Sequence, residues 1–283
     1  MEVDRTKILI STDMEGTTGA VDWNDVLPGK PQYERFRKFL TRDVDSAIKG
    51  AKDGGAGEII VSEAHDGMMN IFIEDLPSDV SMITGHVGKK FGMMEGIDGS
   101  FDAVFLVAYH AMEGTVGAIM NHTWSPTLIR KIWLGDIRVG ELGLSALIAG
   151  HYDVPVTLVT GDDKVAKEAT DLLGNIETAV VKYGISRYAA RCLTPTKTSE
   201  LIKEAAKKAV MNTKKYKPFK LKYPLNIKIE FMSALQASSV SKAKGFELID
   251  PTIVTCTCDN ALDVNLMFSE VFRGRDRVFG PIP

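Results

Sequence analysis

Cysteine is scarce in this chain, with only Cys192, Cys256 and Cys258 among its 283 residues. An odd number of cysteines argues against a disulfide framework, and zinc sites built from thiolates need spacings that are absent here. A chain of this length can bury a sizeable core and does not depend on disulfides for its stability. We therefore expect buried or inert thiols, in a protein of a reducing compartment.

Long apolar runs and an excess of positive charge are also missing. No apolar run approaches the roughly 18–20 residues that a membrane-spanning helix needs. The first ten residues, MEVDRTKILI, are charged and then strand-like, unlike a signal peptide. The net charge is −3, from 34 basic and 37 acidic residues, which offers no basic surface to nucleic acid or to an anionic membrane. We expect a cytoplasmic protein with neither kind of partner.

The composition that remains is that of a globular enzyme, with 45% hydrophobic and 25% charged residues. At roughly 150 residues per domain, the length suggests about two domains. Within residues 1–190, short apolar runs predict strands and three- and four-residue spacings predict helices. We predict an α/β, three-layer Rossmann-like domain with a mainly parallel sheet. Its strands are expected at 7–12, 58–62, 103–109 and 156–160, its helices at 32–53, at 141–152 and from about 164, and a hairpin at 131–139.

The character of the chain changes beyond about residue 190. A lysine-rich amphipathic helix is expected at 197–211, followed by a basic linker that contains proline. Two further strands, at 226–231 and 252–257, and a last helix from about 260 to 272 complete the pattern. We predict a smaller α+β domain over residues 191–283.

Polar side chains stand directly after three of the predicted strands, where ligands bind in open α/β sheets. Asp13 and Glu15 follow the first strand, His65 the second and His110 the third. Glu141 begins a predicted helix, where the helix dipole favours a carboxylate. Oxygen and nitrogen donors without a thiolate suit zinc, manganese or iron, and zinc is the commonest choice for hydrolysis. The pattern therefore predicts a metal site.

Each of these residues also has a structural explanation. Asp13 and Glu15 can hold a turn, His110 can be a hydrogen-bonded core histidine, and Glu141 can be a helix N-terminal residue with no further role. The hypothesis of a metal site depends on the joint placement of all five residues. We interpret the remaining histidines at 86 and 151 as structural.

A phosphatase is the sharpest alternative. The segment DMEGTTG resembles the Asp-x-Asp-Gly-Thr loop of haloacid-dehalogenase-type phosphatases, in which Asp13 would be the phosphorylated nucleophile. Asp162 and Asp163, in TLVTGDD, would then hold magnesium. Glu15 stands where that family has a second aspartate, and its chemistry uses no cluster of histidines. If the five residues named above form the metal site instead, Asp162 and Asp163 are expected to be a helix cap and a charge in the first turn of that helix.

Six segments in order resemble the D-aminopeptidase family of dinuclear zinc peptidases, and every predicted metal ligand falls inside one of them. The likeness covers roughly the first 190 residues and is looser beyond them. The segments are STDMEG (11–16), SEAHDGMMN (62–70), FLVAYHAM (105–112), GAIMNHTW (117–124), VGELGLSALIAGHYDVPV (139–156) and VTGDDKVAKEA (159–169).

The resemblance implies two zinc ions per chain, bridged by Asp13 and completed by Glu15, His65, His110 and Glu141. It places His122 at the catalytic position, as a general base or acid or as a nucleophile; we favour proton transfer, because zinc lowers the pKa of bound water to about 7. It further implies aminopeptidase activity on short peptides or aminoacyl amides, and a homodecamer. Preference for D- or L-residues stays open, as does a non-catalytic peptide-binding protein that retains the metal.

Overall fold

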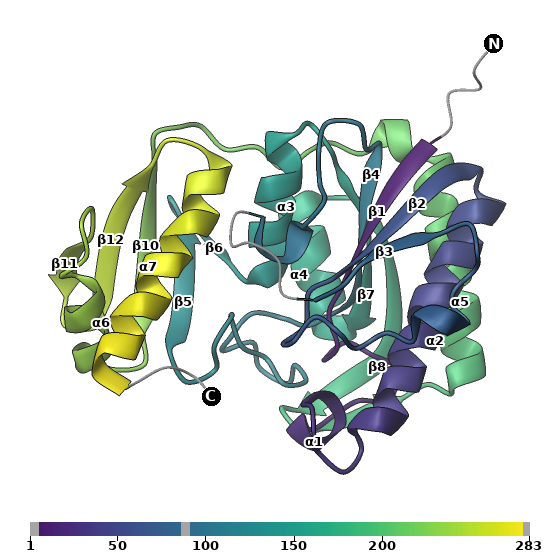
Figure 1. Cartoon of the computed structure of the whole chain (residues 1–283), viewed down its shortest axis with the longest axis horizontal. Helices are drawn as coiled ribbons and strands as arrows, with labels where there is room; N and C mark the ends of the chain where they lie inside the picture. Colours follow the sequence, from purple (N-terminus) through teal and green to yellow (C-terminus); the bar gives the residue numbers. More distant parts are fainter. Residues whose placement is uncertain (1–5, 86–90, 280–283) are drawn as a thin grey trace.

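The computed structural model describes residues 6–85 and 91–279 and arranges them around two sheets (Figure 1). The larger sheet has seven strands in the order β3-β2-β1-β4-β7-β8-β9. All neighbouring strands in it are parallel except β8 and β9. The strands are β1 Thr6–Thr12, β2 Ala56–Glu63, β3 Ser81–Ile83, β4 Ala103–Tyr109, β7 Val156–Asp162, β8 Glu177–Ser186 and β9 Ala189–Cys192.

Helices cover both faces of this sheet and give three layers (Figure 1). One face carries α2 and α5, which pack closely on each other, and the other carries α3 and α4. Short 3₁₀ turns lie at Ile73–Asp75, Gly92–Met94 and Thr213–Lys215. The helices of this part are α1 Trp23–Val26, α2 Tyr33–Asp53, α3 Glu141–His151, α4 Asp163–Leu173 and α5 Pro195–Met211.

The smaller sheet is antiparallel throughout, in the order β11-β12-β10-β5-β6. Figure 1 shows α7 running along it on the side nearest the viewer. Its elements are β5 Ile129–Leu134, β6 Ile137–Val139, β10 Leu225–Phe231, α6 Ala234–Val240, β11 Glu247–Asp250, β12 Ile253–Cys258 and α7 Ala261–Phe279.

The central strand β1 shows why the larger sheet forms. Ile8 and Ile10 point into the core beneath α2 and α5, whereas Leu9 points into the core beneath α3 and α4. All three side chains are fully buried. Because successive strand residues face opposite sides, a strand covered on both faces must be apolar at every position. The three consecutive apolar residues 8–10 (ILI) in the middle of the run KILIST meet that requirement.

Helix α3 joins the two parts of the molecule. Its first ten residues are all buried, as expected of a helix that is apolar on every side. Leu142 and Ile148 pack in a core of the larger sheet, and Leu144 and Leu147 pack in the core of the smaller sheet. The N-terminus of α3 is consequently held between both cores, and Glu141 is its first residue.

The predicted fold class is confirmed, with a mainly parallel sheet in a layered α/β arrangement and a separate sheet. The division at residues 190 and 191 stays a prediction. An element from before the division packs with the C-terminal part, and an element from after it packs with the N-terminal part. The hairpin of β5 and β6 pairs with β10 in the smaller sheet. Helix α5 packs on α2, so closely that a Cβ atom added to Gly50 would lie 2.1 Å from the carbonyl oxygen of Lys203.

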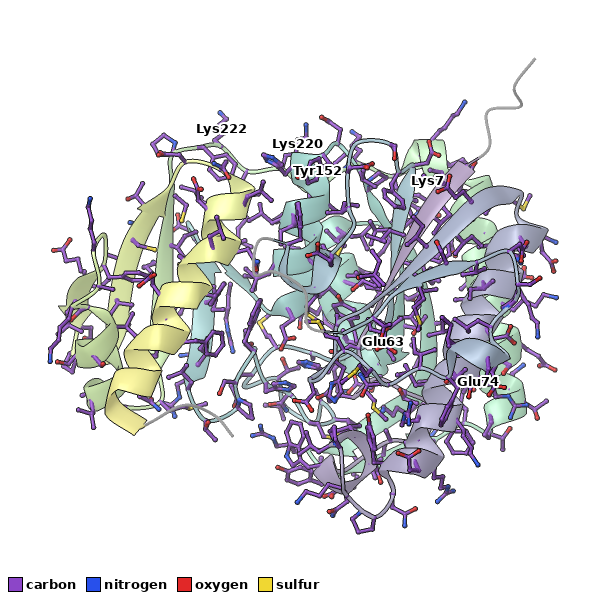
Figure 2. All side chains as sticks on the ribbon, in the orientation of Figure 1. Lys7, Glu63, Glu74, Tyr152, Lys220 and Lys222 are labelled. Atoms are coloured by element: carbon purple, nitrogen blue, oxygen red, sulfur yellow. The ribbon has the colours of Figure 1, made fainter. Side chains whose placement is uncertain are left out.

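The cysteines, the basic linker and the helices can each be compared with what the composition suggested. Cys192 is exposed, Cys256 and Cys258 are buried, and all three thiols are free. Lys220 and Lys222, in the basic linker, lie at the outer edge of the molecule (Figure 2). Across residues 6–85 and 91–279, no helix combines the length and the apolar character that crossing a bilayer requires.

Candidate metal centre

Three adjacent strands bring their carboxyl ends to one place. Strand β1 lies between β2 and β4 and is parallel to both. Asp13 and Glu15 follow β1, His65 lies two residues beyond the end of β2, and His110 follows the last residue of β4. Because these strands are neighbours, residues nearly a hundred positions apart meet at one edge of the sheet.

A glycine lets the loop after β1 lie against the end of β4. A Cβ atom on Gly16 would lie 2.2 Å from the carbonyl oxygen of Tyr109, so no larger residue fits there without a shift of the backbone. The loop is fixed by hydrogen bonds from the Gly16 amide to the Ala108 carbonyl, 2.7 Å, and from the Asp13 amide to the Val107 carbonyl, 2.9 Å.

Left-handed backbone recurs beside the site. Ala108, Asp66, Met68, Met120 and Trp124 all have positive φ angles, between 45° and 61°. Such conformations cost non-glycine residues of order 1–3 kcal/mol each and persist where the surrounding structure enforces them. Here they lie close in sequence to His110, His65 and His122, so local backbone strain accompanies the inward orientation of these side chains.

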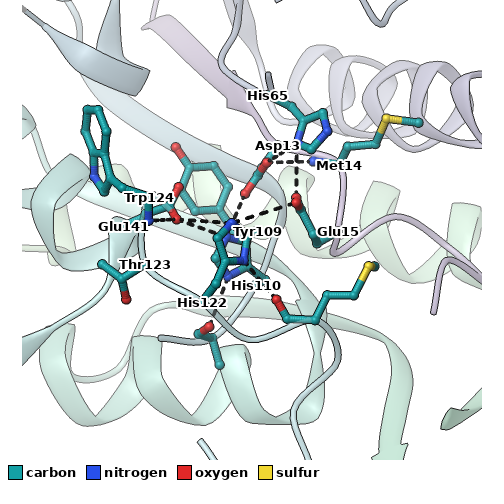
Figure 3. Close-up of polar contacts among 12 residues, drawn as sticks. Asp13, Met14, Glu15, His65, Tyr109, His110, His122, Thr123, Trp124 and Glu141 are labelled. Atoms are coloured by element: carbon teal, nitrogen blue, oxygen red, sulfur yellow. Dashed lines mark hydrogen bonds and ion pairs between the residues drawn. The ribbon is translucent and has the colours of Figure 1, made fainter. Parts of the chain in front are cut away.

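The side chains form two groups that meet at Asp13 (Figure 3). In the first group, the Nδ1 atom of His65 lies 3.1 Å from Asp13 Oδ1 and 3.1 Å from Glu15 Oε2. In the second, the Nε2 atom of His110 lies 3.2 Å from Glu141 Oε1, and 3.4 Å from the other oxygen of Asp13. The two oxygens of one carboxylate therefore face different imidazoles.

His122 completes the second group. Its ring stacks on that of His110, with centroids 4.0 Å apart and planes 12° from parallel. Its Nε2 atom lies 3.7 Å from Glu141 Oε1 and 3.9 Å from Glu15 Oε1. The structure thus brings all six residues selected from the sequence into one buried cluster, Asp13, Glu15, His65, His110, His122 and Glu141, each no more than 7% exposed.

Backbone carbonyls orient the three imidazoles. His65 Nε2 lies 2.9 Å from the Val26 oxygen, His110 Nδ1 3.0 Å from the Ala111 oxygen, and His122 Nδ1 2.8 Å from the Met120 oxygen. Since a carbonyl only accepts, the nitrogen that faces it carries the hydrogen, and the inward nitrogen of a neutral ring presents a lone pair. This outer arrangement is typical of histidines that bind metals.

The cluster also contains polar atoms that the protein itself does not satisfy. Asp13 Oδ2, Glu15 Oε2 and His110 Nε2 are buried and form no well-aligned hydrogen bond within the part of the chain that the structure describes. Buried polar atoms rarely lack a hydrogen-bond partner, and ionised carboxylates that share a buried site repel one another. A cation in each of the two groups would satisfy these atoms, so the donor set fits the dinuclear site that the resemblance implies.

Protonation shifts show how strongly the carboxylates and imidazoles interact. Burial, together with the Glu15 carboxylate, raises the pKa of Asp13 to about 7. Burial alone would raise the pKa of Glu15, but His65 and the other imidazoles lower it well below its usual value. Burial would lower the pKa values of His65 and His110, yet Glu15 and Glu141 respectively raise them well above the ordinary range.

Glu141 and His122 are shifted downward. Burial would raise the pKa of Glu141, and His110 outweighs it and lowers that pKa. Burial and the neighbouring His110 lower the pKa of His122. His122 is thereby distinguished from the other two histidines, because the protein favours its neutral form.

The two groups open into a cavity of about 620 Å³. The sequence did not identify its apolar wall, to which Trp23, Trp124, Phe268 and Phe272 contribute. The two phenylalanines belong to a helix whose apolar spacing is that of an ordinary core-facing helix. No feature of the sequence separates such residues from core residues.

Asp162 and Asp163 contact the start of α4 and neighbouring backbone rather than the cluster. Asp162 is the N-cap of α4 and accepts hydrogen bonds from the amides of Lys164 and Val165. Asp163 pairs with the Lys164 ammonium at 2.7 Å and accepts from the Gly184 amide. Neither belongs to the two groups among the described residues whose side chains could hold a metal ion. The prediction of a helix cap is confirmed, and the magnesium site of the phosphatase alternative is not favoured.

Of the two remaining histidines, His151 lies outside the cluster. His151 is the last residue of α3, exposed, with its ring edge-on to Tyr152. Position 86 lies outside the described residues.

Comparisons with known proteins agree with the geometry. A family model described as D-aminopeptidase matches residues 6–269. The D-aminopeptidase of Bacillus subtilis (strain 168) is 39% identical over 242 residues, which make up 86% of this chain and 87% of that protein. A solved structure, described as the Zn-dependent D-aminopeptidase DppA from Bacillus subtilis, a self-compartmentalizing protease, matches with a TM-score of 0.93. Its sequence is 35% identical, and the match covers 97% of this chain and 99% of that chain.

The shifted pKa values predict how zinc and pH act together on stability. In the metal-free protein, the raised pKa values of His65 and His110 provide stability below about pH 6.5 that is lost as the pH rises through the folded-state values. The raised pKa of Asp13 acts in the same direction, because stability falls as pH rises from about 4 to about 7. Zinc bound by this cluster would replace these protons, so the rise in Tm on adding zinc should be larger at about pH 8 than at about pH 6.

Thermal unfolding of chelator-treated and zinc-loaded samples at both pH values measures this effect. Glu15 and Glu141 have lowered pKa values, so their contribution is present above about pH 4.5 and is constant across the comparison. An equal zinc effect at both pH values would show that protons and zinc do not compete for this cluster.

Proposed function

Because the chain belongs to the D-aminopeptidase family of peptidases, we propose that it is a zinc-dependent aminopeptidase that hydrolyses short peptides or aminoacyl amides. Asp13, Glu15, His65, His110 and Glu141 would hold two zinc ions per chain, with Asp13 shared between the two. His122 is the catalytic residue. The relatives are D-aminopeptidases, and the proposal extends their preference for D-residues to this chain.

One observation carries the proposal: the carboxylate of Asp13 presents a different oxygen to each of the two groups. Asp13 Oδ1 faces His65, and Asp13 Oδ2, which lacks a hydrogen-bond partner among the described residues, faces His110. A carboxylate in this position suits a bridge between two cations. This arrangement does not suit Asp13 as a phosphorylated nucleophile, because such a nucleophile needs a free oxygen and both oxygens of Asp13 face imidazoles.

Zinc in such a site polarises a carbonyl group as a Lewis acid and lowers the pKa of water to about 7. The protein supplies a proton acceptor in His122. Its Nδ1–H is fixed on the Met120 carbonyl, and its lowered pKa keeps the ring neutral near pH 7, so Nε2 can take a proton. Once protonated, that nitrogen lies 3.7 Å from Glu141 and 3.9 Å from Glu15, whose carboxylates stabilise the positive charge.

We further propose that the chain forms a homo-oligomer in the cytoplasm, and specifically a decamer. The solved relative is described as self-compartmentalizing. Val116 and Ile185 are the most exposed of the large apolar side chains among the described residues, at 91% and 70%. The loop that contains Val116 lies beside the end of β8, which contains Ile185, since a Cβ atom on Gly117 would be 3.8 Å from the Ile185 carbonyl oxygen. Contiguous exposed apolar patches are typical of contact surfaces between proteins, and these two side chains would contribute to one.

The function is tested by comparing the wild-type protein with His122→Ala. We expect both to bind two zinc ions per chain, because His122 is not among the proposed ligands. The wild-type protein should hydrolyse aminoacyl amides, and the variant should be slower by about 10²–10⁴-fold, the usual contribution of a general acid or base. Zinc content by elemental analysis and kcat on D- and L-aminoacyl amides are the measurements.

The outcomes separate the alternatives. Full activity in the variant would remove His122 from the mechanism, and turnover by zinc-free protein would contradict the metal-dependent reaction as a whole. Zinc binding without hydrolysis of any amide or dipeptide would favour the non-catalytic peptide-binding protein.

A further inference from the structure

One wall of the cavity is apolar and comes from both parts of the molecule. Trp23 belongs to α1, beside the larger sheet, and Leu27 is the C-cap of the same helix. Phe268 and Phe272 reach the cavity from α7, beside the smaller sheet. Among the described residues that line the cavity, the charged side chains outside the two metal-binding groups are limited to Asp66.

The wall is fixed relative to the proposed zinc ligands. The Trp124 ring stacks on Phe268, with centroids 4.9 Å apart and planes 11° from parallel, and lies 5.9 Å from the ring of Phe272. The backbone amide of Trp124 donates to Glu141 Oε1 at 2.7 Å. An aromatic surface anchored in the core of the smaller sheet thus begins directly beside a ligand carboxylate.

We propose that this wall binds an apolar side chain, aliphatic or aromatic, next to the scissile bond of the substrate. The inference rests on the proposed function and names its substrate class: peptides whose reacting residue is leucine-like or phenylalanine-like rather than charged. The reason is that a charged side chain would lose its hydration against this wall without gaining a partner. A hydrophobic pocket separates substrates that differ by one methylene by about 10–200-fold.

The test compares kcat/KM for alanyl, leucyl, phenylalanyl, aspartyl and lysyl amides, in both D and L series. We expect leucyl or phenylalanyl amide to exceed alanyl amide by at least about 10-fold in the accepted series. Phe272→Ala should reduce this ratio and Phe272→Leu should leave an intermediate value. A ratio measured on one sample does not change with the fraction of folded enzyme.

Phe39→Ala is the matched control, because Phe39 is a half-buried aromatic of α2 that packs on the opposite core. Its ratio should equal that of the wild type. Equal rates on alanyl and leucyl amides, a preference for charged amides, or an unchanged ratio in Phe272→Ala would overturn the subsite. Failure to hydrolyse any of these amides would instead contradict the proposed function.

A second, independent observation concerns Lys182, a fully buried lysine in β8. Its Nζ atom donates to three backbone carbonyls, those of Glu15 at 2.5 Å, Thr17 at 2.9 Å and Ala20 at 2.6 Å. An ammonium group has three hydrogens, and each finds an acceptor here, which offsets the cost of removing the charge from water. All three acceptors belong to the loop that follows β1.

The far side of the same loop is held by other contacts. The amide and hydroxyl of Thr18 both donate to Asp43 of α2 at 2.8 Å, and the hydroxyl also lies 2.8 Å from that of Thr198 in α5. These contacts fix the middle of the loop. Lys182 differs from them because it holds the backbone of Glu15 itself, one of the two carboxylates that the loop supplies.

We infer that Lys182 is a positioning residue for the zinc site, because it fixes the backbone of Glu15 and of the loop that follows. It touches neither the proposed substrate site nor any reacting atom. Residues that orient metal ligands from outside typically contribute about 10–100-fold to metal affinity. This inference also rests on the proposed zinc site.

Lys182→Met keeps the length of the side chain and removes all three donors. We expect zinc affinity, measured by competition with a chromophoric chelator, to fall by about 10–100-fold while far-UV circular dichroism stays close to wild type. Lys182→Gln, which retains two donors on a shorter side chain, should show a smaller loss. Val181→Ala is the matched control, because it removes buried volume from the same strand without touching the loop.

Zinc affinity equal to wild type in Lys182→Met, or a loss matched by Val181→Ala at equal thermal stability, would overturn the positioning role. Failure of both Lys182 variants to fold, with Val181→Ala folded, would also overturn it and assign Lys182 to the fold alone. If the wild-type protein binds no zinc, the proposed function fails rather than this inference.

Discussion

The carboxylate of Asp13, buried between two imidazoles, is the contact on which the site depends. Its oxygens face His65 on one side and His110 on the other. A carboxylate in such a position needs positive charge on both sides, since burial and Glu15 otherwise raise its pKa to about 7. The proposed pair of zinc ions meets that need, and the fold places His65 and His110 on opposite sides of Asp13.

The fold achieves this with the rigid ends of three parallel strands and the N-terminus of a buried helix. The apolar run of β1 fixes the strand between β2 and β4, and Gly16 allows the loop to lie against the end of β4. Helix α3 holds Glu141 because it is packed between two cores. The smaller sheet therefore serves the site twice, by supporting α3 and by supplying the aromatic wall beside it.

Much of this arrangement was predictable from the sequence, because local patterns determine it. The apolar runs predicted β1, β2, β4 and β7, and the positions of polar residues after them predicted the cluster. Non-local pairing was not predictable: the hairpin of β5 and β6 was expected, but its partner β10 lies about ninety residues later. Strands β3, β8, β9 and β11 and the short helices α1 and α6 were not predicted. The sequence does not distinguish Lys182 from an ordinary strand lysine, because its three carbonyl partners lie far away in the chain.

The central claim is that Asp13 bridges two zinc ions, and anomalous diffraction at the zinc absorption edge tests it most directly. Crystals of the zinc-loaded protein should show two peaks per chain, one between Asp13, Glu15 and His65 and the other between Asp13, His110 and Glu141. A single peak, or two peaks of which only one contacts Asp13, would contradict the account.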